Sequence, residues 1–193
     1  NIMDFRIKGK KVIGLTGGIS SGKSTVLEIF GELGAETICA DNLGRKYFEI
    51  LKDRIAETFN TADRAKIASL IFKDDAKRKW MKNLLHRMII SQAQESIKNT
   101  DKAIIVFDLP LLFEAGLEGG FDLTICVWAD DKVRLARALA KGFEREDFKR
   151  RDLKQYGLEL KADKADIVIC NNGDRKTLKE KTVRIFNIIK GNQ

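Results

Sequence analysis

A short segment near the start of the chain constrains its fold more than any other feature. Residues 17–25 read Gly-Gly-Ile-Ser-Ser-Gly-Lys-Ser-Thr, and they follow an apolar run and precede a helical pattern. Small residues let successive backbone N–H groups converge on phosphate oxygens, a lysine adds charge for the β- and γ-phosphates, and a hydroxyl can ligate Mg²⁺. The alternative is a glycine-rich turn that binds nothing. The spacing predicts a strand, a nucleotide-phosphate loop and a helix, with these loop residues: Gly17, Gly18, Ile19, Ser20, Ser21, Gly22, Lys23, Ser24 and Thr25.

The composition of the chain indicates which classes of molecule it can bind. A net charge of +8 suits a partner rich in phosphate, which includes nucleotides, phosphorylated metabolites and nucleic acid. Basic runs such as residues 77–79 are typical of a solvated helix face, and no basic stripe is interleaved with aromatic residues, so nucleic acid is not expected. Cys39, Cys126 and Cys170 are odd in number and far apart, which indicates reduced thiols in a cytoplasmic protein. The sequence lacks a membrane-spanning stretch, and it does not determine the oligomeric state.

Five short apolar runs alternate with helical patterns along the chain. Each run is too apolar to be half exposed, which favours an α/β fold with a parallel five-stranded sheet covered by helices on both faces. At 193 residues the chain fits a single domain, residues 1–193. The predicted strands are Val12–Thr16, Thr37–Asp41, Ile104–Asp108, Leu123–Trp128 and Ile167–Asn171.

Functional groups in such a sheet collect where the strands end. Asp108 closes the third run, where a carboxylate can hold Mg²⁺ directly or through water, although it can also be a helix cap. Asp41 closes the second run, where a carboxylate can orient and deprotonate an acceptor hydroxyl. Asn171, Asn172 and Gly173 follow the fifth run, and their backbone can meet a nucleotide base unless they form a simple turn.

Cations crowd the stretch after the fourth run. Phosphoryl transfer needs positive charge around the transferred group and exclusion of water, and arginines on a mobile lid supply both. Arg137 and Lys141 lie four residues apart, on one face of a helix. A solvated surface helix is the alternative. The other cations of this stretch are Arg134, Arg145 and Arg151.

Taken together, these motifs resemble the dephospho-coenzyme A kinase family over almost the whole chain. The loop in its family form spans residues 14–25, and Cys39-Ala40-Asp41 with Arg45 aligns with an Asp-Ala-Asp segment and its following Arg. Residues 108–114 match Asp-x-Pro-Leu-Leu-Phe-Glu, the most distinctive block. The remaining matches are Arg151-x-x-x-Gln155 and the Ala-Asp-x-Val-Ile-x-Asn ending at residues 165–173.

The resemblance implies a P-loop kinase fold with a helical substrate-binding part at residues 42–100 and a lid at residues 131–156. It implies transfer of the γ-phosphoryl group of ATP to the ribose 3′-hydroxyl of dephospho-CoA, giving CoA and ADP in the last step of coenzyme A biosynthesis. Lys23 and Mg²⁺, held by Ser24 and Asp108, would neutralise the phosphates. Asp41 would be the base, and Arg137 would clamp the transferred group. Further substrate contacts would come from Arg45, His86, Leu109 and Pro110.

Three positions depart from the family pattern. Cys39 stands where the family has its first Asp, Arg87 follows Leu85-His86 where the family usually has Pro, and the stretch between residues 59 and 67 is short. Asp41 is then the sole carboxylate of its segment, either as a base or as a second-layer Mg²⁺ ligand through water. Another small-molecule or nucleoside kinase, or a non-enzymatic or motor-type nucleotide-binding module, remains the alternative.

Overall fold

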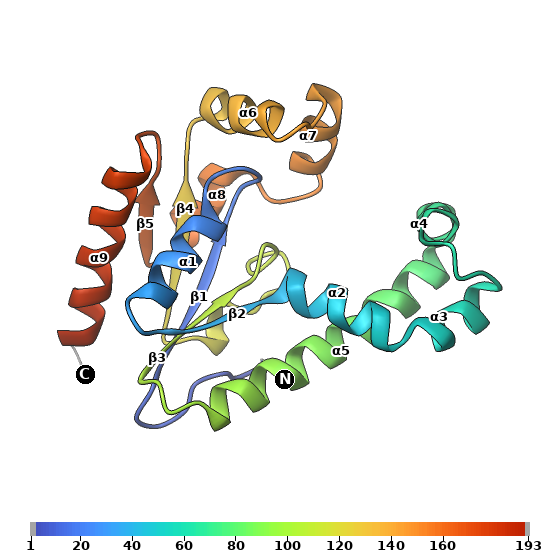
Figure 1. Ribbon diagram of the computed structural model, residues 1–193, viewed down its shortest axis with the longest axis horizontal. Coiled ribbons are helices and arrows are strands. Elements are labelled where there is room, and N and C mark those ends of the chain that lie inside the picture. Colours follow the sequence, from blue (N-terminus) through green and yellow to red (C-terminus); the bar gives the residue numbers. More distant parts are fainter. Residues whose placement is uncertain (1–2, 192–193) are drawn as a thin grey trace. The chain divides into compact units, whose positions relative to one another are not determined.

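The computed structural model describes residues 3–191, and its centre is a five-stranded sheet (Figure 1). The strand order is β2-β3-β1-β4-β5, and β1 pairs in parallel with β3 and β4, as β4 does with β5. The prediction of a parallel five-stranded sheet is confirmed. The strands are β1 (Lys11–Gly17), β2 (Glu36–Cys39), β3 (Ile104–Asp108), β4 (Leu123–Trp128) and β5 (Ile167–Cys170).

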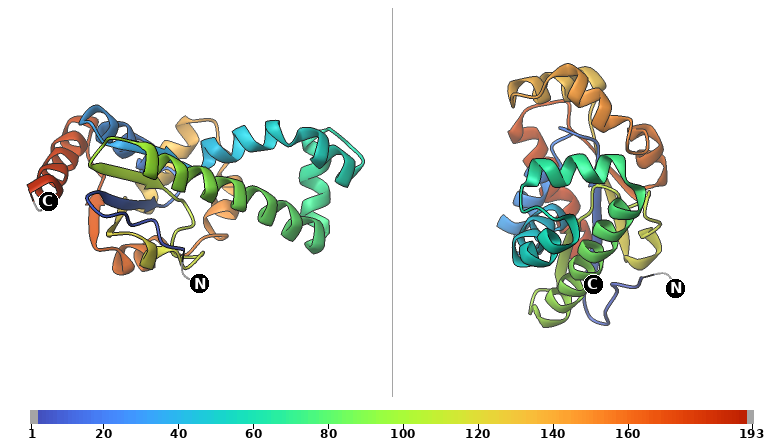
Figure 2. Two further views of the ribbon diagram at one scale, coloured as in Figure 1. Left: turned by 90° about the horizontal axis from the view of Figure 1, so that it is seen from below. Right: turned by 90° about the vertical axis from the view of Figure 1, so that its right-hand side faces the viewer.

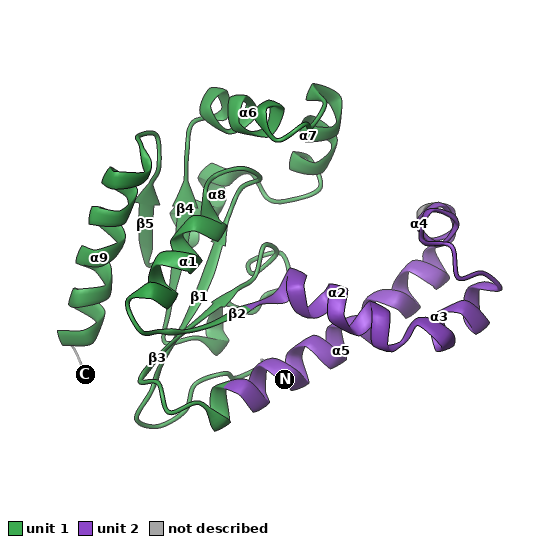
Figure 3. Ribbon diagram, viewed as in Figure 1, with its two compact units in different colours: residues 1–38, 97–193 green, residues 39–96 purple. Residues whose placement is uncertain are grey.

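The chain divides into two compact units, residues 1–38 with 97–193 and residues 39–96 (Figure 3). The first unit holds the sheet, and the second is entirely helical apart from short connections. The helices are α1 (Lys23–Glu32), α2 (Ala40–Ile50), α3 (Lys52–Phe59), α4 (Arg64–Lys73), α5 (Asp75–Asn99), the short 3₁₀ turn η1 (Glu118–Gly120), α6 (Asp131–Ala140), α7 (Arg145–Asp152), α8 (Leu158–Lys164) and α9 (Arg175–Gly191).

Alternation along β1 explains why both faces of the sheet are covered. Ile13 and Leu15 point to one face and join a buried cluster that includes Phe30 of α1 and Phe186 of α9. On the other face, Gly14 leaves room for the loop after β3, because a Cβ there would lie 2.5 Å from Leu112 Cδ1. Figure 2 shows α1 and α8 on opposite sides of the sheet. The buried β1 therefore carries the loop of residues 17–22 to one end of a rigid core.

The two edge strands differ from their predictions. Both β2 and β5 are partly exposed, and Val168 of β5 is 44% exposed, so the expectation that every strand is fully buried is wrong for these two. An edge strand has one neighbour, and its second side faces water. In addition, β2 ends at Cys39 and Asp41 lies in the first turn of α2, so the expectation that Asp41 closes a strand is wrong. The sheet order also puts β3 between β1 and β2.

The second unit has its own small core. Ile55, Phe59, Ile67 and Met81 are buried together, and the Phe59 and Trp80 rings meet edge to face at 5.9 Å. The apolar residues between positions 43 and 59 lie on two helices, α2 and α3, which separate at Leu51. α2 and α3 are short and amphipathic, so each depends on this shared core for its stability.

Within residues 3–191, no helix combines the length and apolar character that crossing a membrane requires. The three cysteines form no disulfide, and Cys126 is buried in β4, where burial raises the pKa of its thiol to about 12. Cys39 and Cys170 are partly exposed.

Candidate active site

The loop between β1 and α1 has the backbone of an anion cradle. Gly22 has φ 98°, in the left-handed region, and a Cβ on it would lie 2.1 Å from Asn171 Nδ2. Ser20 also has a positive φ, of 59°, which a non-glycine residue adopts at some cost in strain. α1 begins at Lys23, directly after the loop, and the N-terminus of a helix favours a bound anion. The geometry fits the predicted phosphate site.

Asn171 fastens this loop to the end of β5. Its side chain is 5% exposed, and its Nδ2 donates to the Ser21 carbonyl at 2.7 Å. Asn172 uses its amide to hold Asp130 before α6, accepting from the backbone N–H at 2.9 Å and donating to the carboxylate at 2.8 Å. The predicted contact of residues 171–173 with a nucleotide base stays a prediction. The side chains of Asn171 and Asn172 also have a structural role, because they link the end of β5 to the loop and to the start of α6.

Lys23 forms an ion pair with Asp108, which closes β3 as predicted. Their side chains are 12% and 3% exposed, so both charges are largely withdrawn from water. The register pairs Asp108 with Leu15 of β1, and this pairing fixes the carboxylate beside the loop. Ser24 follows Lys23 and is exposed. A hydroxyl and a carboxylate, completed by phosphate oxygens and water, are the oxygen ligands that Mg²⁺ prefers, so these residues fit the predicted metal.

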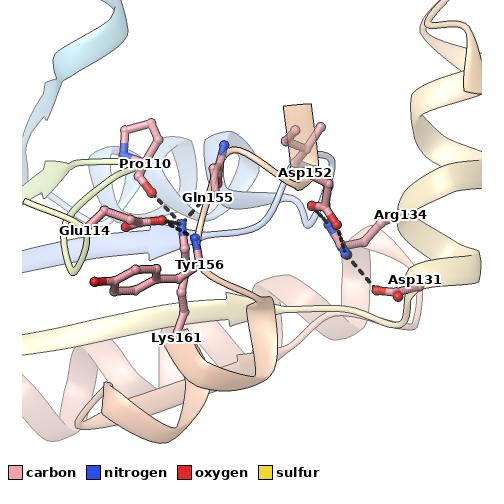
Figure 4. A network of polar contacts seen from close by, with 9 residues as sticks. Pro110, Glu114, Asp131, Arg134, Asp152, Gln155, Tyr156 and Lys161 are labelled. Atoms are coloured by element: carbon pink, nitrogen blue, oxygen red, sulfur yellow. Dashed lines mark hydrogen bonds and ion pairs between the residues drawn. The ribbon is translucent and has the colours of Figure 1, made fainter. Parts of the chain in front are cut away.

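Arg134 of α6 lies against the loop and is 2% exposed. Its guanidinium binds both oxygens of Asp152 in α7, at 2.7 and 3.1 Å, and Asp131 at 2.7 Å (Figure 4). Burial opposes the charge, but these hydrogen bonds outweigh it and raise the pKa of Arg134 above its ordinary value. The loop approaches so closely that a Cβ on Gly18 would lie 2.8 Å from Arg134 Nη1.

Arg137 has different hydrogen-bond partners from Arg134. Its guanidinium donates to the Asn171 carbonyl at 2.9 Å and to the Gly173 carbonyl at 3.2 Å. In this structure, therefore, Arg137 holds the turn after β5. Its predicted role as a clamp on the transferred group stays a prediction, and it requires the guanidinium to leave these carbonyls.

The loop after β3 contains the predicted substrate residues Leu109 and Pro110. Leu109 is 8% exposed and donates its N–H to the Leu15 carbonyl at 2.9 Å. The Pro110 carbonyl accepts from Thr16 Oγ1 at 3.2 Å and from Lys161 Nζ at 2.7 Å. Sequence reasoning did not identify Lys161, although all three partners of its ammonium group, Pro110, Glu114 and Gln155, lie in the resemblance motifs.

The remaining predicted residues lie in the second unit. Asp41 is exposed in the first turn of α2, and Arg45, one helical turn later, donates to the side chain of Asn42. His86 is half-buried on α5, where burial, and to a lesser degree the charge of Lys82, lowers the pKa of His86 below its ordinary value. A lowered pKa keeps the imidazole neutral near pH 7. The roles predicted for these three residues stay predictions.

Comparison with known families gives a match over most of the chain. The model of the dephospho-CoA kinase family matches residues 11–177. A dephospho-CoA kinase from Geobacillus kaustophilus is 34% identical over 189 residues, covering 90% of this chain and 94% of the relative. A dephospho-CoA kinase from Aquifex aeolicus is 32% identical over 188 residues, covering 91% and 96%.

Solved structures agree with this match. Dephospho-CoA kinase from Campylobacter jejuni has a TM-score of 0.71 and 26% identity, covering 95% of this chain and all of that one (100%). A crystal structure from Thermus thermophilus reaches a TM-score of 0.85 at 28% identity, covering 93% and 98%. Shikimate kinase from Acinetobacter baumannii has a TM-score of 0.54 at 14% identity, covering 95% of each chain, which shows a shared fold alone.

Proposed function

The chain belongs to the dephospho-CoA kinase family, and we propose that it transfers the γ-phosphoryl group of ATP to the ribose 3′-hydroxyl of dephospho-CoA. The products are CoA and ADP, so the reaction completes coenzyme A. The observation that carries the proposal is the match of the family over residues 11–177, which includes both the phosphate loop and the loop after β3. The kinase fold alone would not select the acceptor, since shikimate kinase shares it.

The phosphate end of the site follows from the loop geometry. Backbone N–H groups within the loop of residues 17–25 hold the phosphates of ATP, and Lys23 supplies positive charge to the transferred group. Ser24 and Asp108 hold Mg²⁺, whose chemistry is to neutralise the charge that develops on the phosphate oxygens. Since Lys23 is paired with Asp108 in this structure, nucleotide binding must draw Lys23 toward phosphate.

For the acceptor end, we infer roles from the family pattern. Asp41 orients the acceptor hydroxyl and accepts its proton, with Arg45 and His86 contacting dephospho-CoA from the helical unit, residues 39–96. Leu109 and Pro110 contact it from the loop after β3. Arg137, on the lid of residues 131–156, clamps the transferred group once it leaves the carbonyls of residues 171 and 173. A cytoplasmic location and the absence of a nucleic-acid partner stay predictions.

The test is ADP release measured with Mg·ATP in the presence and absence of dephospho-CoA, with shikimate and nucleosides as competing acceptors. We expect release that depends on dephospho-CoA and a product with one added phosphate on the ribose. Equal or greater turnover with another acceptor would contradict the proposed substrate.

Lys23→Ala serves as the matched inactive control. The substitution removes a preorganised charge from the transferred group, so we expect kcat to fall by about 10³ or more while the fold is retained. Steady-state kinetics and circular dichroism check both parts. A kcat near that of the wild type would remove Lys23 from the reaction.

A further inference from the structure

Two motifs of the family pattern, residues 108–114 and 151–155, converge on a lysine that the roles above do not use. Lys161 of α8 is fully buried, at 0% exposed. Its ammonium group donates to the Pro110 carbonyl at 2.7 Å and to Gln155 Oε1 at 3.0 Å, and it forms an ion pair with Glu114 Oε1 at 2.9 Å (Figure 4). The three protons of the ammonium group therefore have three acceptors, which fixes its position.

The acceptors connect Lys161 to separate segments of the first unit. Glu114 Oε1 also accepts the backbone N–H of Tyr156, at 2.8 Å, where the predicted lid ends. The Pro110 carbonyl also accepts from Thr16, the residue before the phosphate loop begins at Gly17. The ammonium group thus joins the lid end at residues 155 and 156, the loop of residues 109–114, and the end of β1.

The Lys161 ammonium group is buried at a position where an apolar side chain would be expected to pack, so its charge depends on its partners. A buried ammonium group is costly unless its geometry and partners are complete, and removing one partner leaves an uncompensated charge. The three contacts of Lys161 therefore depend on one another, and together they hold one arrangement of the lid end. Within the lid, Arg134 near its start binds Asp131 and also Asp152, which lies close to its C-terminal end.

We propose that Lys161 is a positioning residue for phosphoryl transfer: it anchors the C-terminal end of the lid to the loop of residues 109–114. The inference rests on the proposed function, because it deepens the role of that same site. A lid that closes over nucleotide turns about its ends, so a fixed end determines where the lid arginines arrive relative to Lys23. If the anchor is lost, fewer molecules reach the productive closed arrangement, and kcat falls in proportion.

The first variant is Lys161→Met, which keeps an unbranched side chain only one atom shorter and removes the charge. We expect kcat to fall about 10- to 100-fold with the KM for ATP changed by less than about 3-fold, and Tm to fall by about 10 °C. Lys164→Met is the matched control, because it makes the same substitution on the same helix at a side chain that is 42% exposed. It should leave kcat and KM unchanged. A wild-type kcat in Lys161→Met would overturn the proposal.

A double variant separates positioning from stability. Lys161→Met with Glu114→Gln removes both charges, so no carboxylate is left buried without its cation, and part of the lost Tm should return. The anchor is still absent, so kcat should stay low. Recovery of kcat together with Tm would show that Lys161 supports the fold alone, and it would overturn the positioning role.

Hydrogen exchange provides a readout that does not need dephospho-CoA. With Mg·ATP bound, Lys161→Met should raise exchange at least about 10-fold in residues 153–160 and leave α9 unchanged, whereas general destabilisation would raise exchange in both. If wild-type protein does not phosphorylate dephospho-CoA, the proposed function fails, and exchange still decides whether Lys161 anchors the lid end. Unchanged exchange in residues 153–160 would overturn the anchor even in an active kinase.

Discussion

At the scale of single residues, the pairing of Lys23 with Asp108 shows how the site is held before nucleotide binds. Each side chain is the counter-ion of the other, and both are largely buried. Under the proposed function, phosphate would compete with the carboxylate for Lys23, while Mg²⁺ bound with the nucleotide would compensate Asp108. We therefore expect the pair to favour the nucleotide that arrives with its metal over the nucleotide alone.

Asp108→Asn tests this competition. The substitution removes the carboxylate that restrains Lys23, so affinity for metal-free ATP should rise about 3- to 10-fold, while kcat should fall at least about 100-fold because a metal ligand is lost. Titration calorimetry with ATP in EDTA and in excess Mg²⁺ measures the first effect. Weaker binding in EDTA would mean that Asp108 does not restrain Lys23.

The role proposed for Asp41 rests on the family pattern, because it concerns the acceptor hydroxyl of the substrate. It lies in the first turn of α2, where a negative charge also interacts well with the helix dipole. Asp41→Asn keeps the size of the side chain and removes its basic oxygen. If Asp41 is the base, kcat should fall about 10²- to 10⁴-fold while the Kd for ATP barely changes.

A second pattern would identify a different role for Asp41. If it holds Mg²⁺ through water, affinity for Mg·ATP should fall together with kcat, and added Mg²⁺ should restore part of both. Wild-type values for kcat, Kd and Mg²⁺ dependence would leave Asp41 with a helix-terminal role alone.

At the scale of elements, the phosphate loop depends on a contact that comes from the far end of the chain. Gly22 needs a left-handed backbone, and Asn171 from the end of β5 occupies the space where a Cβ would lie. Gly22→Ala should therefore weaken ATP binding by at least about 10-fold, from backbone strain and from displacement of the Asn171 amide.

Adding Asn171→Ala to Gly22→Ala distinguishes these two causes. The double variant removes the clash and keeps the strain, so it should recover part of the ATP affinity if displacement matters. Asn171→Ala alone should lower affinity modestly, because the Ser21 carbonyl loses its donor. Fluorescence titration with a labelled ATP analogue measures the affinity of all three variants. Equal affinities for Gly22→Ala and for the double variant would assign the effect to backbone strain.

These elements differ in how well the sequence predicted them. β3 and β4 were predicted at their observed bounds, because each is a continuous and largely buried run. β2 was extended too far, because Ala40 and Asp41 continue the polarity pattern of an edge strand and yet begin a helix. The phosphate loop was predictable because its residues are adjacent in sequence. The partners of Lys161 were not, because Pro110 and Glu114 lie far from it in the sequence and come close only in the folded chain. The pairing of Arg134 with Asp152 likewise depends on how α6 and α7 pack.

At the scale of the whole molecule, the segment before residue 11 packs on the first unit. It lies outside the family match, because that match begins at residue 11. Phe5 is 2% exposed, and its ring stacks on Phe121 at 4.8 Å and meets Phe107 edge to face at 5.5 Å. Its N–H donates to the Gly120 carbonyl at 2.9 Å. The segment thereby covers the face of the sheet opposite α1, against β3, which is the strand that carries Asp108.

Phe5→Ala measures how much this cover contributes. Truncating a buried aromatic ring costs about 3–5 kcal/mol, which for a domain of this size lowers Tm by about 6–20 °C. The kcat at 25 °C should stay within about 2-fold of the wild type, because the pairing of Asp108 with Leu15 in the sheet, rather than the ring below it, positions the carboxylate. Arg6→Ala, at a neighbouring exposed side chain, should leave Tm unchanged within about 1 °C. Thermal unfolding and steady-state kinetics on both variants separate the two effects: a loss of kcat in Phe5→Ala at a temperature where it is fully folded would mean that the N-terminal segment also helps to position Asp108.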